Sequence, residues 1–197
     1  MNTHKFIVLV PHRDSRLLLE DYRRKLFAAG FNGAYAFPTV APLALVKKPF
    51  EKDELKALAK EIRQISLLND GKISTGELSS LQAEIFNGAS FFGPLLDLPS
   101  LDKIPWDIIP GFINDKVLFT FPGVVLCAAA LNVRDVCVGS WLENVKSLLP
   151  DFQPFSFRAA MVTNLIIRPL KTGAEPFSFK WRLEEGCWLP KYERKEK

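Results

Sequence analysis

The chain has 197 residues, 48% of them hydrophobic and 24% charged, with a formal net charge of +4. This balance is typical of a globular domain and excludes a disordered or fibrous chain. Three cysteines without C-x-x-C spacing and only two histidines predict reduced thiols, no metal site and no cofactor. The longest apolar stretch, residues 117–133, is interrupted by Pro122 and is shorter than the ~20 residues of a membrane span. We therefore expect a cytoplasmic protein with no membrane partner.

The chain begins with an expected strand and helix. Residues 5–11, KFIVLVP, predict a buried strand ended by proline, and Asp14 or Ser15 is expected to cap the helix that follows. Residues 34–46 predict extended backbone, because the two prolines within them, Pro38 and Pro42, cannot occupy a helix interior. The same prolines predict an edge strand or a bulge. Apolar residues recur at helical spacing in the expected helix, namely Leu19, Tyr22, Leu26 and Ala29.

The middle of the chain predicts a helix and then a hairpin. Residues 52–66 place leucine and isoleucine on one helical face and charged residues on the other. Two apolar runs flank Asn87-Gly88, a dipeptide that favours a tight hairpin turn. Residues 100–115 are rich in proline and predict a connector.

The same order then recurs. Residues 116–133 predict extended backbone, and Ser140 and Glu143 match a capping box ahead of a helix that Pro150 stops. A second hairpin is expected around residues 171–175, and the charged residues 191–197 predict a frayed tail.

The motif Phe-Pro-x-Val opens both extended stretches, at residues 37–40 and 121–124. Each copy is followed by a predicted helix and a predicted hairpin. This repeat predicts an α+β fold over residues 1–197, with two lobes related by a pseudo-twofold axis. Each lobe would be an antiparallel sheet with helices on its outer face, and we expect the two Phe-Pro strands to lie centrally in two facing sheets.

The arrangement resembles the 2H phosphoesterase superfamily, the LigT-like proteins that include RNA cyclic phosphodiesterases and 2′-5′ RNA ligases. The resemblance is carried by FIVLVP with LLLEDYRRKLFAAG, by FPTVAPLALVKKPFEKDELKALAKEI, and by MVTNLIIRPLKTGAEPFSFKWRLEEGCWL near the end. It implies a bilobal LigT-like domain whose cleft carries two His-x-Thr/Ser motifs, one from each lobe. In that family one imidazole is the general base and the other the general acid.

Both motifs are missing here. The strands that should carry them, residues 36–46 and 119–131, contain no histidine, and the two histidines of the chain are His4 and His12. In the register we favour, Val40 and Pro42 replace the first histidine and hydroxyl residue. Val124 and Leu126 replace the second pair. The resemblance therefore implies a degenerate member without catalytic residues.

Three functions stay open from the sequence. The first is a non-catalytic 2H-like protein whose cleft binds a nucleotide, an RNA end, another small ligand or a partner. The second is an active phosphoric diester hydrolase that uses unrecognised residues. The third is a structural or interaction module with a filled cleft.

Basic residues in the first fifty positions outnumber acidic ones by 8 to 3. They predict a surface patch on the first helix around Arg16, Arg23 and Arg24, where RNA or a nucleotide could bind, or else an ordinary solvated face. Thr39 is the hydroxyl nearest the first degenerate motif. The aromatic residues of FSFKW, residues 177–181, could stack bases as in single-strand binders, but alternating aromatic residues in a strand are more typical of the core. His12, Asp14 and Ser15 lie too close together in one loop to form a catalytic triad on their own.

Overall fold

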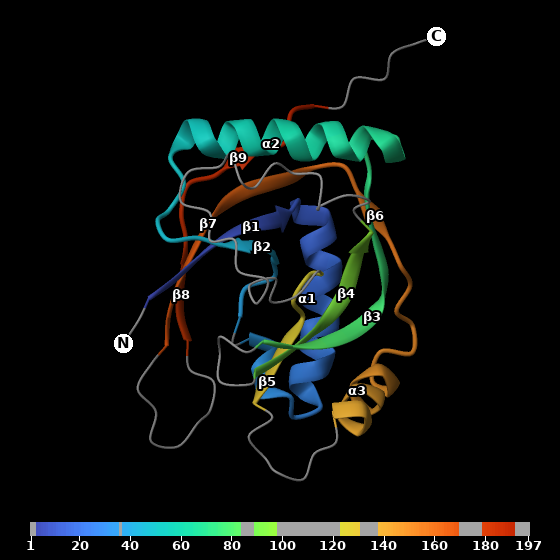
Figure 1. Ribbon diagram of the computed structural model, residues 1–197. Coiled ribbons are helices and arrows are strands. Elements are labelled where there is room, and N and C mark those ends of the chain that lie inside the picture. The colour runs from blue at the N-terminus through green and yellow to red at the C-terminus, as the bar shows by residue number, and fades with distance from the viewer. Residues whose placement is uncertain are drawn as a thin grey trace.

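The computed structural model describes residues 3–35, 37–83, 89–97, 123–130, 138–169 and 179–191. Within these ranges the chain forms two antiparallel sheets together with helices, so the predicted α+β class is confirmed. The two sheets lie against each other, and α2 lies over the face of the first sheet toward which Ile7 and Leu9 point (Figure 1). The predicted connector at residues 100–115 and the turns of both predicted hairpins lie outside the described residues.

The first sheet joins the two ends of the chain. Its strand order is β2-β1-β7-β8, and β9 also pairs with β7, all neighbours being antiparallel. The predicted opening strand is β1, and the predicted last hairpin supplies β7 and β8. The strands are β1 (His4–Pro11), β2 (Ala41–Leu45), β7 (Ala160–Pro169), β8 (Phe179–Leu183) and β9 (Cys187–Trp188).

The second sheet has the order β5-β4-β3-β6. Its centre is the predicted first hairpin, in which β3 and β4 pair antiparallel. The strands are β3 (Ile73–Ala83), β4 (Ala89–Asp97), β5 (Cys127–Ala130) and β6 (Ser156–Phe157). Residues 154–170 were predicted as one strand of the last hairpin, and the structure divides this run into β6, which joins the second sheet, and β7, which joins the first.

Three α-helices lie in the described ranges: α1 (Arg13–Ala28), α2 (Lys52–Ser66) and α3 (Val138–Ser147). The bounds predicted for α2 are confirmed, and its first turn is closed by a capping box between Glu51 and Glu54. Short 3-10 turns, η1 (Asn32–Tyr35) and η2 (Leu67–Asn69), follow α1 and α2. No helix within the described ranges is long and apolar enough to cross a membrane.

The predicted helix caps are wrong in two helices. The N-cap of α1 is His12, whose side chain makes no capping hydrogen bond, so Asp14 and Ser15 lie inside the first turn. The backbone N–H of His12 donates to the carbonyl of Ala159, 2.9 Å away, so the chain stays attached to the sheet until the helix begins. Helix α3 begins at Val138, before the expected cap at Ser140.

The apolar residues of β1 alternate between two buried clusters. Ile7 and Leu9 join a helix-side cluster that includes buried residues of all three α-helices. Phe6, Val8 and Val10 join an inter-sheet cluster built from both sheets without helical residues. Because both faces of β1 are buried, its side chains are apolar without interruption, which explains why the strand was visible in the sequence. The other members of the inter-sheet cluster are Phe37, Val40, Phe91, Val125, Leu165 and Ile167.

The proline-rich strand lies at a sheet end, as its prolines predicted. Strand β2 is the terminal strand of the described first sheet, and its register against β1 shifts between Ile7 and Val8, where Pro42 faces Val8. The further expectation that both Phe-Pro strands are central is wrong, because β5 likewise ends the described second sheet. A proline has no backbone N–H to donate to a neighbouring strand, so it is disfavoured in a central strand.

Gly93 in β4 allows the chain after the second Phe-Pro to cross close to the sheet. A Cβ built on Gly93 would lie 1.8 Å from the carbonyl oxygen of Val124. The crossing is held by hydrogen bonds from the N–H of Val124 to Pro94 and from the N–H of Leu126 to Phe92, at 2.9 and 2.8 Å.

We predict that Gly93→Ala lowers the free energy of unfolding by more than about 3 kcal/mol, because a backbone carbonyl cannot move aside cheaply. The matched control is Gly76→Ala in β3, where a Cβ would meet nothing within 4 Å. That control should change stability by less than about 1 kcal/mol in urea denaturation. Equal effects of the two substitutions would contradict the close crossing.

Candidate functional site

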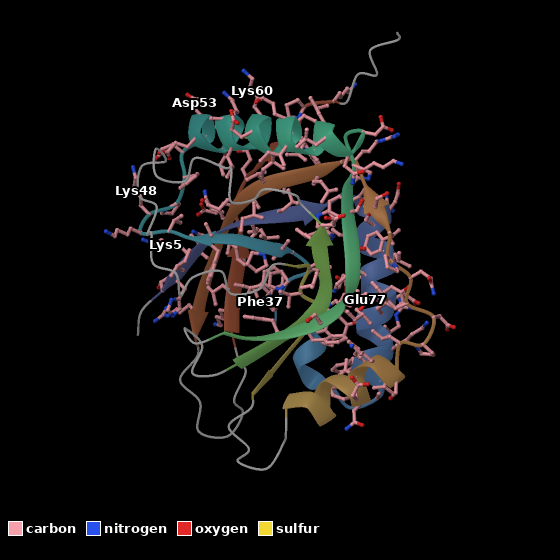
Figure 2. The ribbon with its side chains drawn as sticks, turned by 45° about the vertical axis from the view of Figure 1, so that its right-hand side comes forward. Lys5, Phe37, Lys48, Asp53, Lys60 and Glu77 are labelled. Carbon is pink, nitrogen blue, oxygen red and sulfur yellow. The ribbon has the colours of Figure 1, made fainter. Side chains whose placement is uncertain are left out.

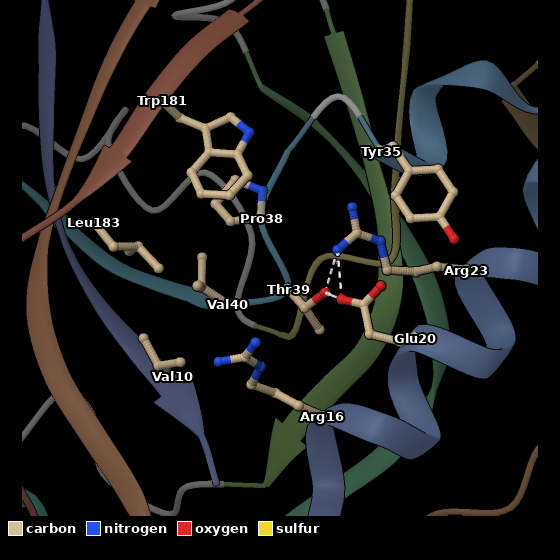
Figure 3. A pocket seen from close by; sticks show the side chains of 10 residues that line it. All are labelled: Val10, Arg16, Glu20, Arg23, Tyr35, Pro38, Thr39, Val40, Trp181 and Leu183. Atoms are coloured by element: carbon tan, nitrogen blue, oxygen red, sulfur yellow. Dashed lines mark hydrogen bonds and ion pairs between the residues drawn. The ribbon is translucent and has the colours of Figure 1, made fainter. Parts of the chain in front are cut away.

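A pocket of about 220 Å³ opens between α1, the segment that follows η1, and the inward face of β8 (Figure 3). It contains three of the four residues that the sequence singled out for ligand binding: Arg16, Arg23 and Thr39. The fourth, Arg24, does not line it. The residues around the pocket are Val10, Arg16, Glu20, Arg23, Tyr35, Pro38, Thr39, Val40, Trp181 and Leu183.

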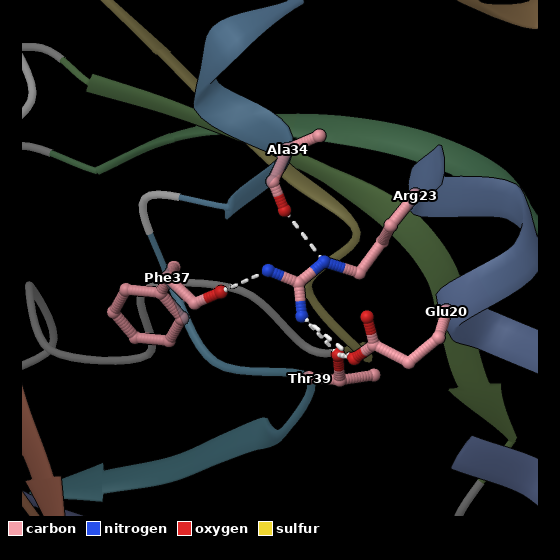
Figure 4. Close-up of polar contacts among 5 residues, drawn as sticks. All are labelled: Glu20, Arg23, Ala34, Phe37 and Thr39. Atoms are coloured by element: carbon pink, nitrogen blue, oxygen red, sulfur yellow. Dashed lines mark hydrogen bonds and ion pairs between the residues drawn. The ribbon is translucent and has the colours of Figure 1, made fainter. Parts of the chain in front are cut away.

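Arg23 fixes the Phe-Pro segment against α1 (Figure 4). Its guanidinium donates from Nε to the carbonyl of Ala34 at 2.5 Å and from Nη2 to the carbonyl of Phe37 at 2.7 Å. Its Nη1 donates to Glu20 Oε1 at 3.0 Å and to the hydroxyl of Thr39. The side chain is 4% exposed, so these contacts form with little competition from water. Arg23 therefore acts as a structural link.

The hydroxyl of Thr39 is also occupied by the protein. It accepts a hydrogen bond from Arg23 and donates one to Glu20 Oε1. Tyr35 covers the other side of the guanidinium, with the Arg23 Cζ 4.9 Å from the ring centroid. We therefore correct the prediction that Arg23 and Thr39 bind phosphate, because their donors already serve the fold.

The predicted basic patch on α1 is wrong as a single surface. Arg16, Glu20 and Arg23 are spaced by four and three residues, so they lie on one face of α1. Arg24 directly follows Arg23 and therefore points to a different side of the helix. The Arg24 side chain is 72% exposed and pairs with Asp21 at 3.4 Å. Arg16 is the one predicted cation that is both exposed and placed at the pocket.

The opposite wall of the pocket is aromatic and apolar. Trp181 and Leu183 alternate along β8 and face the pocket, and Trp181 is 43% exposed. The sequence interpretation assigned the aromatic residues of FSFKW to the core. In β8, Trp181 and Leu183 alternate with Lys180 and Arg182. This alternation indicated that the strand has two different faces, but it could not show that one face is only half covered.

The two segments that the resemblance assigned to the missing motifs meet directly. The N–H of Val125 donates to the carbonyl of Val40 at 2.9 Å, and both side chains belong to the inter-sheet cluster. Beside them the rings of Phe37 and Phe91 stand edge to face, with centroids 5.0 Å apart. The space between the two segments is therefore packed at this point.

The segment expected to carry the second motif does not turn Val124 toward Val40. Val124 and Leu126 belong to the helix-side cluster, so Val125 is the residue that faces Val40. Pro42 is buried in β2. A one-residue shift turns every side chain of an extended segment to its other face, and the sequence had no polar residue here to mark the correct one.

Neither histidine lines the pocket. His12 packs against the ring of Trp188, with centroids 5.8 Å apart, and lies 3.9 Å from an Asp14 carboxylate that is 90% exposed. Burial lowers the pKa of His4 in β1. Within the described ranges, no group of three or more His, Cys, Asp or Glu side chains could hold a metal ion.

No family model, curated protein or solved structure matches the chain. The pocket and the closed contact between Val40 and Val125 are therefore interpreted from their own chemistry.

We predict that Arg23→Lys destabilises the fold by about 2–4 kcal/mol, because each buried carbonyl left unpaired costs about 1–3 kcal/mol. A lysine ammonium cannot reach Ala34, Phe37 and Thr39 together from one position. The control is Arg24→Lys on the same helix, expected to change stability by less than about 0.5 kcal/mol in urea denaturation. A tolerated Arg23→Lys would show that the buried hydrogen bonds contribute little.

Proposed function

We propose that the chain is a non-catalytic 2H-like protein that binds a nucleotide, or the terminal nucleotide of an RNA, in the pocket between α1 and β8. The single observation that carries this proposal is an exposed guanidinium, Arg16, at a pocket that also presents the half-exposed indole of Trp181. Two antiparallel sheets with a shared buried cluster between them support the LigT-like part of the proposal.

Arg16 suits a phosphate group. It is exposed at the pocket and makes no ion pair with another described side chain, unlike Arg23 and Arg24. Its planar guanidinium can donate two parallel hydrogen bonds to phosphate oxygens. Glu20, which also lines the pocket, does not neutralise Arg16, because its Oε1 accepts from Arg23 and Thr39.

Trp181 suits a nucleobase. An indole that is half covered on an apolar wall offers a flat surface for a base, and such stacking contributes about 1–3 kcal/mol per base. The volume of about 220 Å³ lies below the roughly 300–1,000 Å³ of pockets for drug-sized ligands, so we expect one nucleotide unit.

The described pocket residues do not support acid–base catalysis. The positions that the resemblance assigns to imidazoles are Val40 and Val124, and neither these nor Val125, which faces Val40, can transfer a proton. Glu20 is the one carboxylate among the lining residues, and it is held by two donors. Binding therefore fits the geometry better than hydrolysis.

A second candidate function, an interaction module with a filled cleft, is supported by a different observation. The direct hydrogen bond between Val125 and Val40 and the surrounding apolar cluster close the space where a 2H active site would lie. In this case the chain would bind no nucleotide, and the pocket would be an ordinary surface hollow.

We predict that Arg16→Ala and Trp181→Ala each weaken the binding of adenosine monophosphate at least tenfold, measured by isothermal titration calorimetry at low salt. Arg16 would lose the phosphate contact and Trp181 the stacking surface. The control is Arg24→Ala, which removes an equal charge from the same helix outside the pocket. If the wild-type protein binds no mononucleotide, the filled-cleft module is the better description.

We further predict no measurable ring opening of 2′,3′-cyclic nucleotides by the purified protein. A positioned general acid or base contributes about 10²–10⁴-fold to a rate, and both are missing. Turnover that survives His12→Ala would show that unrecognised residues carry out the chemistry. Turnover abolished by His12→Ala would make that histidine catalytic.

A further inference from the structure

Basic side chains gather on the outer face of the first sheet, the face opposite the pocket. Arg168 in β7 lies directly across from Lys180 in β8, and Ile166 separates Lys5 of β1 from Arg182 of β8 in one cross-strand row. The ammonium of Lys5 donates to the carbonyl of Lys47 at 3.1 Å, so the backbone that carries Lys47 and Lys48 lies beside Lys5. The basic face consists of Lys5, Lys47, Lys48, Arg168, Lys180 and Arg182, and Lys5 and Lys48 are visible together in Figure 2.

The positions of these charges are unfavourable for the isolated fold. Side chains directly opposite on antiparallel strands lie about 4.5–5.5 Å apart at Cβ, where like charges repel. Arg168 and Lys180 occupy such a pair, and both are exposed. Within the described ranges the acidic group paired with this face is Glu184, which lies 3.0 Å from Arg182 and is 29% exposed. Most of the positive charge is therefore left for another molecule.

We propose that this basic face binds the phosphate backbone of single-stranded nucleic acid. Lys180 and Arg182 are two residues apart on one strand, so their side chains rise from the same face about 6.6–6.8 Å apart. Arg168 and Lys5 extend the row across the neighbouring strands. A flat array of cations with two arginines fits a chain of phosphates.

Strand β8 connects the basic face with the aromatic pocket. Lys180 and Arg182 point to one side of the strand, and Trp181 and Leu183 point to the other, where they line the pocket. A single-stranded nucleic acid that crosses β8 would contact the cations of the basic face and then the indole of Trp181. Single-strand binders use this combination of cations and a stacking surface. The basic face does not depend on the pocket, so the two sites can be tested apart.

A membrane surface is a poorer fit. Stable membrane attachment needs an apolar anchor beside a polybasic patch. The half-exposed Trp181 next to Lys180 and Arg182 faces the opposite side of β8.

The test measures binding of a fluorescein-labelled single-stranded RNA of about 12 nucleotides, within the usual site size of roughly 4–16. The test variant combines Arg168→Gln, Lys180→Gln and Arg182→Gln. The control variant combines Arg24→Gln, Lys56→Gln and Lys60→Gln, which removes the same charge from exposed helical positions. Fluorescence anisotropy at several salt concentrations gives the affinity and its salt slope.

We expect the test variant to lose at least tenfold in affinity and about 2 units of salt slope, since each lost phosphate contact on a single strand removes roughly 0.7. The control variant should stay close to wild type, and calorimetric binding of adenosine monophosphate should be unchanged in both variants. Thermal melting checks folding, and the test variant should be at least as stable as wild type at low salt. Equal losses in both variants, an unchanged salt slope, no RNA binding by wild type, or binding to anionic vesicles in place of RNA would each overturn the proposal.

Discussion

The guanidinium of Arg23 is the contact on which the site depends. It binds carbonyls of Ala34 and Phe37 and the hydroxyl of Thr39, and so holds the first Phe-Pro segment against α1. Residues 37–40 form no strand, so their buried carbonyls need donors from elsewhere: that of Val40 accepts from the N–H of Val125, and that of Phe37 accepts from the Arg23 side chain. A single arginine with five N–H groups meets this need, and a lysine does not.

Two consequences follow from this link. On one side, Pro38 and Val40 form the floor of the pocket that Arg16 and Trp181 border. On the other side, Phe37 reaches the ring of Phe91 and the carbonyl of Val40 meets the N–H of Val125. The same segment therefore shapes the open pocket and closes the space between the sheets. This closed contact supports the proposed binding role over a hydrolytic one.

The sequence predicted β1 and α2 well, because burial of both faces makes β1 continuously apolar and burial of one face gives α2 its helical period. It did not predict the register of residues 124–126, where every side chain is apolar and either face would suit the core. It also placed Arg23 among surface cations, since a buried arginine that binds backbone carbonyls leaves no charged partner in the pattern. Trp181 was missed as a pocket residue because its half exposure depends on α1 and Pro38, far away in sequence.

The central claim is that a nucleobase stacks on Trp181. The most direct measurement is a ¹H–¹⁵N NMR titration of the indole Nε1–H groups with adenosine monophosphate, with Trp181→Phe used to assign the signal. The account predicts a saturable shift of the Trp181 resonance, while Trp188, which packs against His12 outside the pocket, stays unchanged. A titration in which Trp181 does not move, or in which Trp188 responds in its place, would contradict the account.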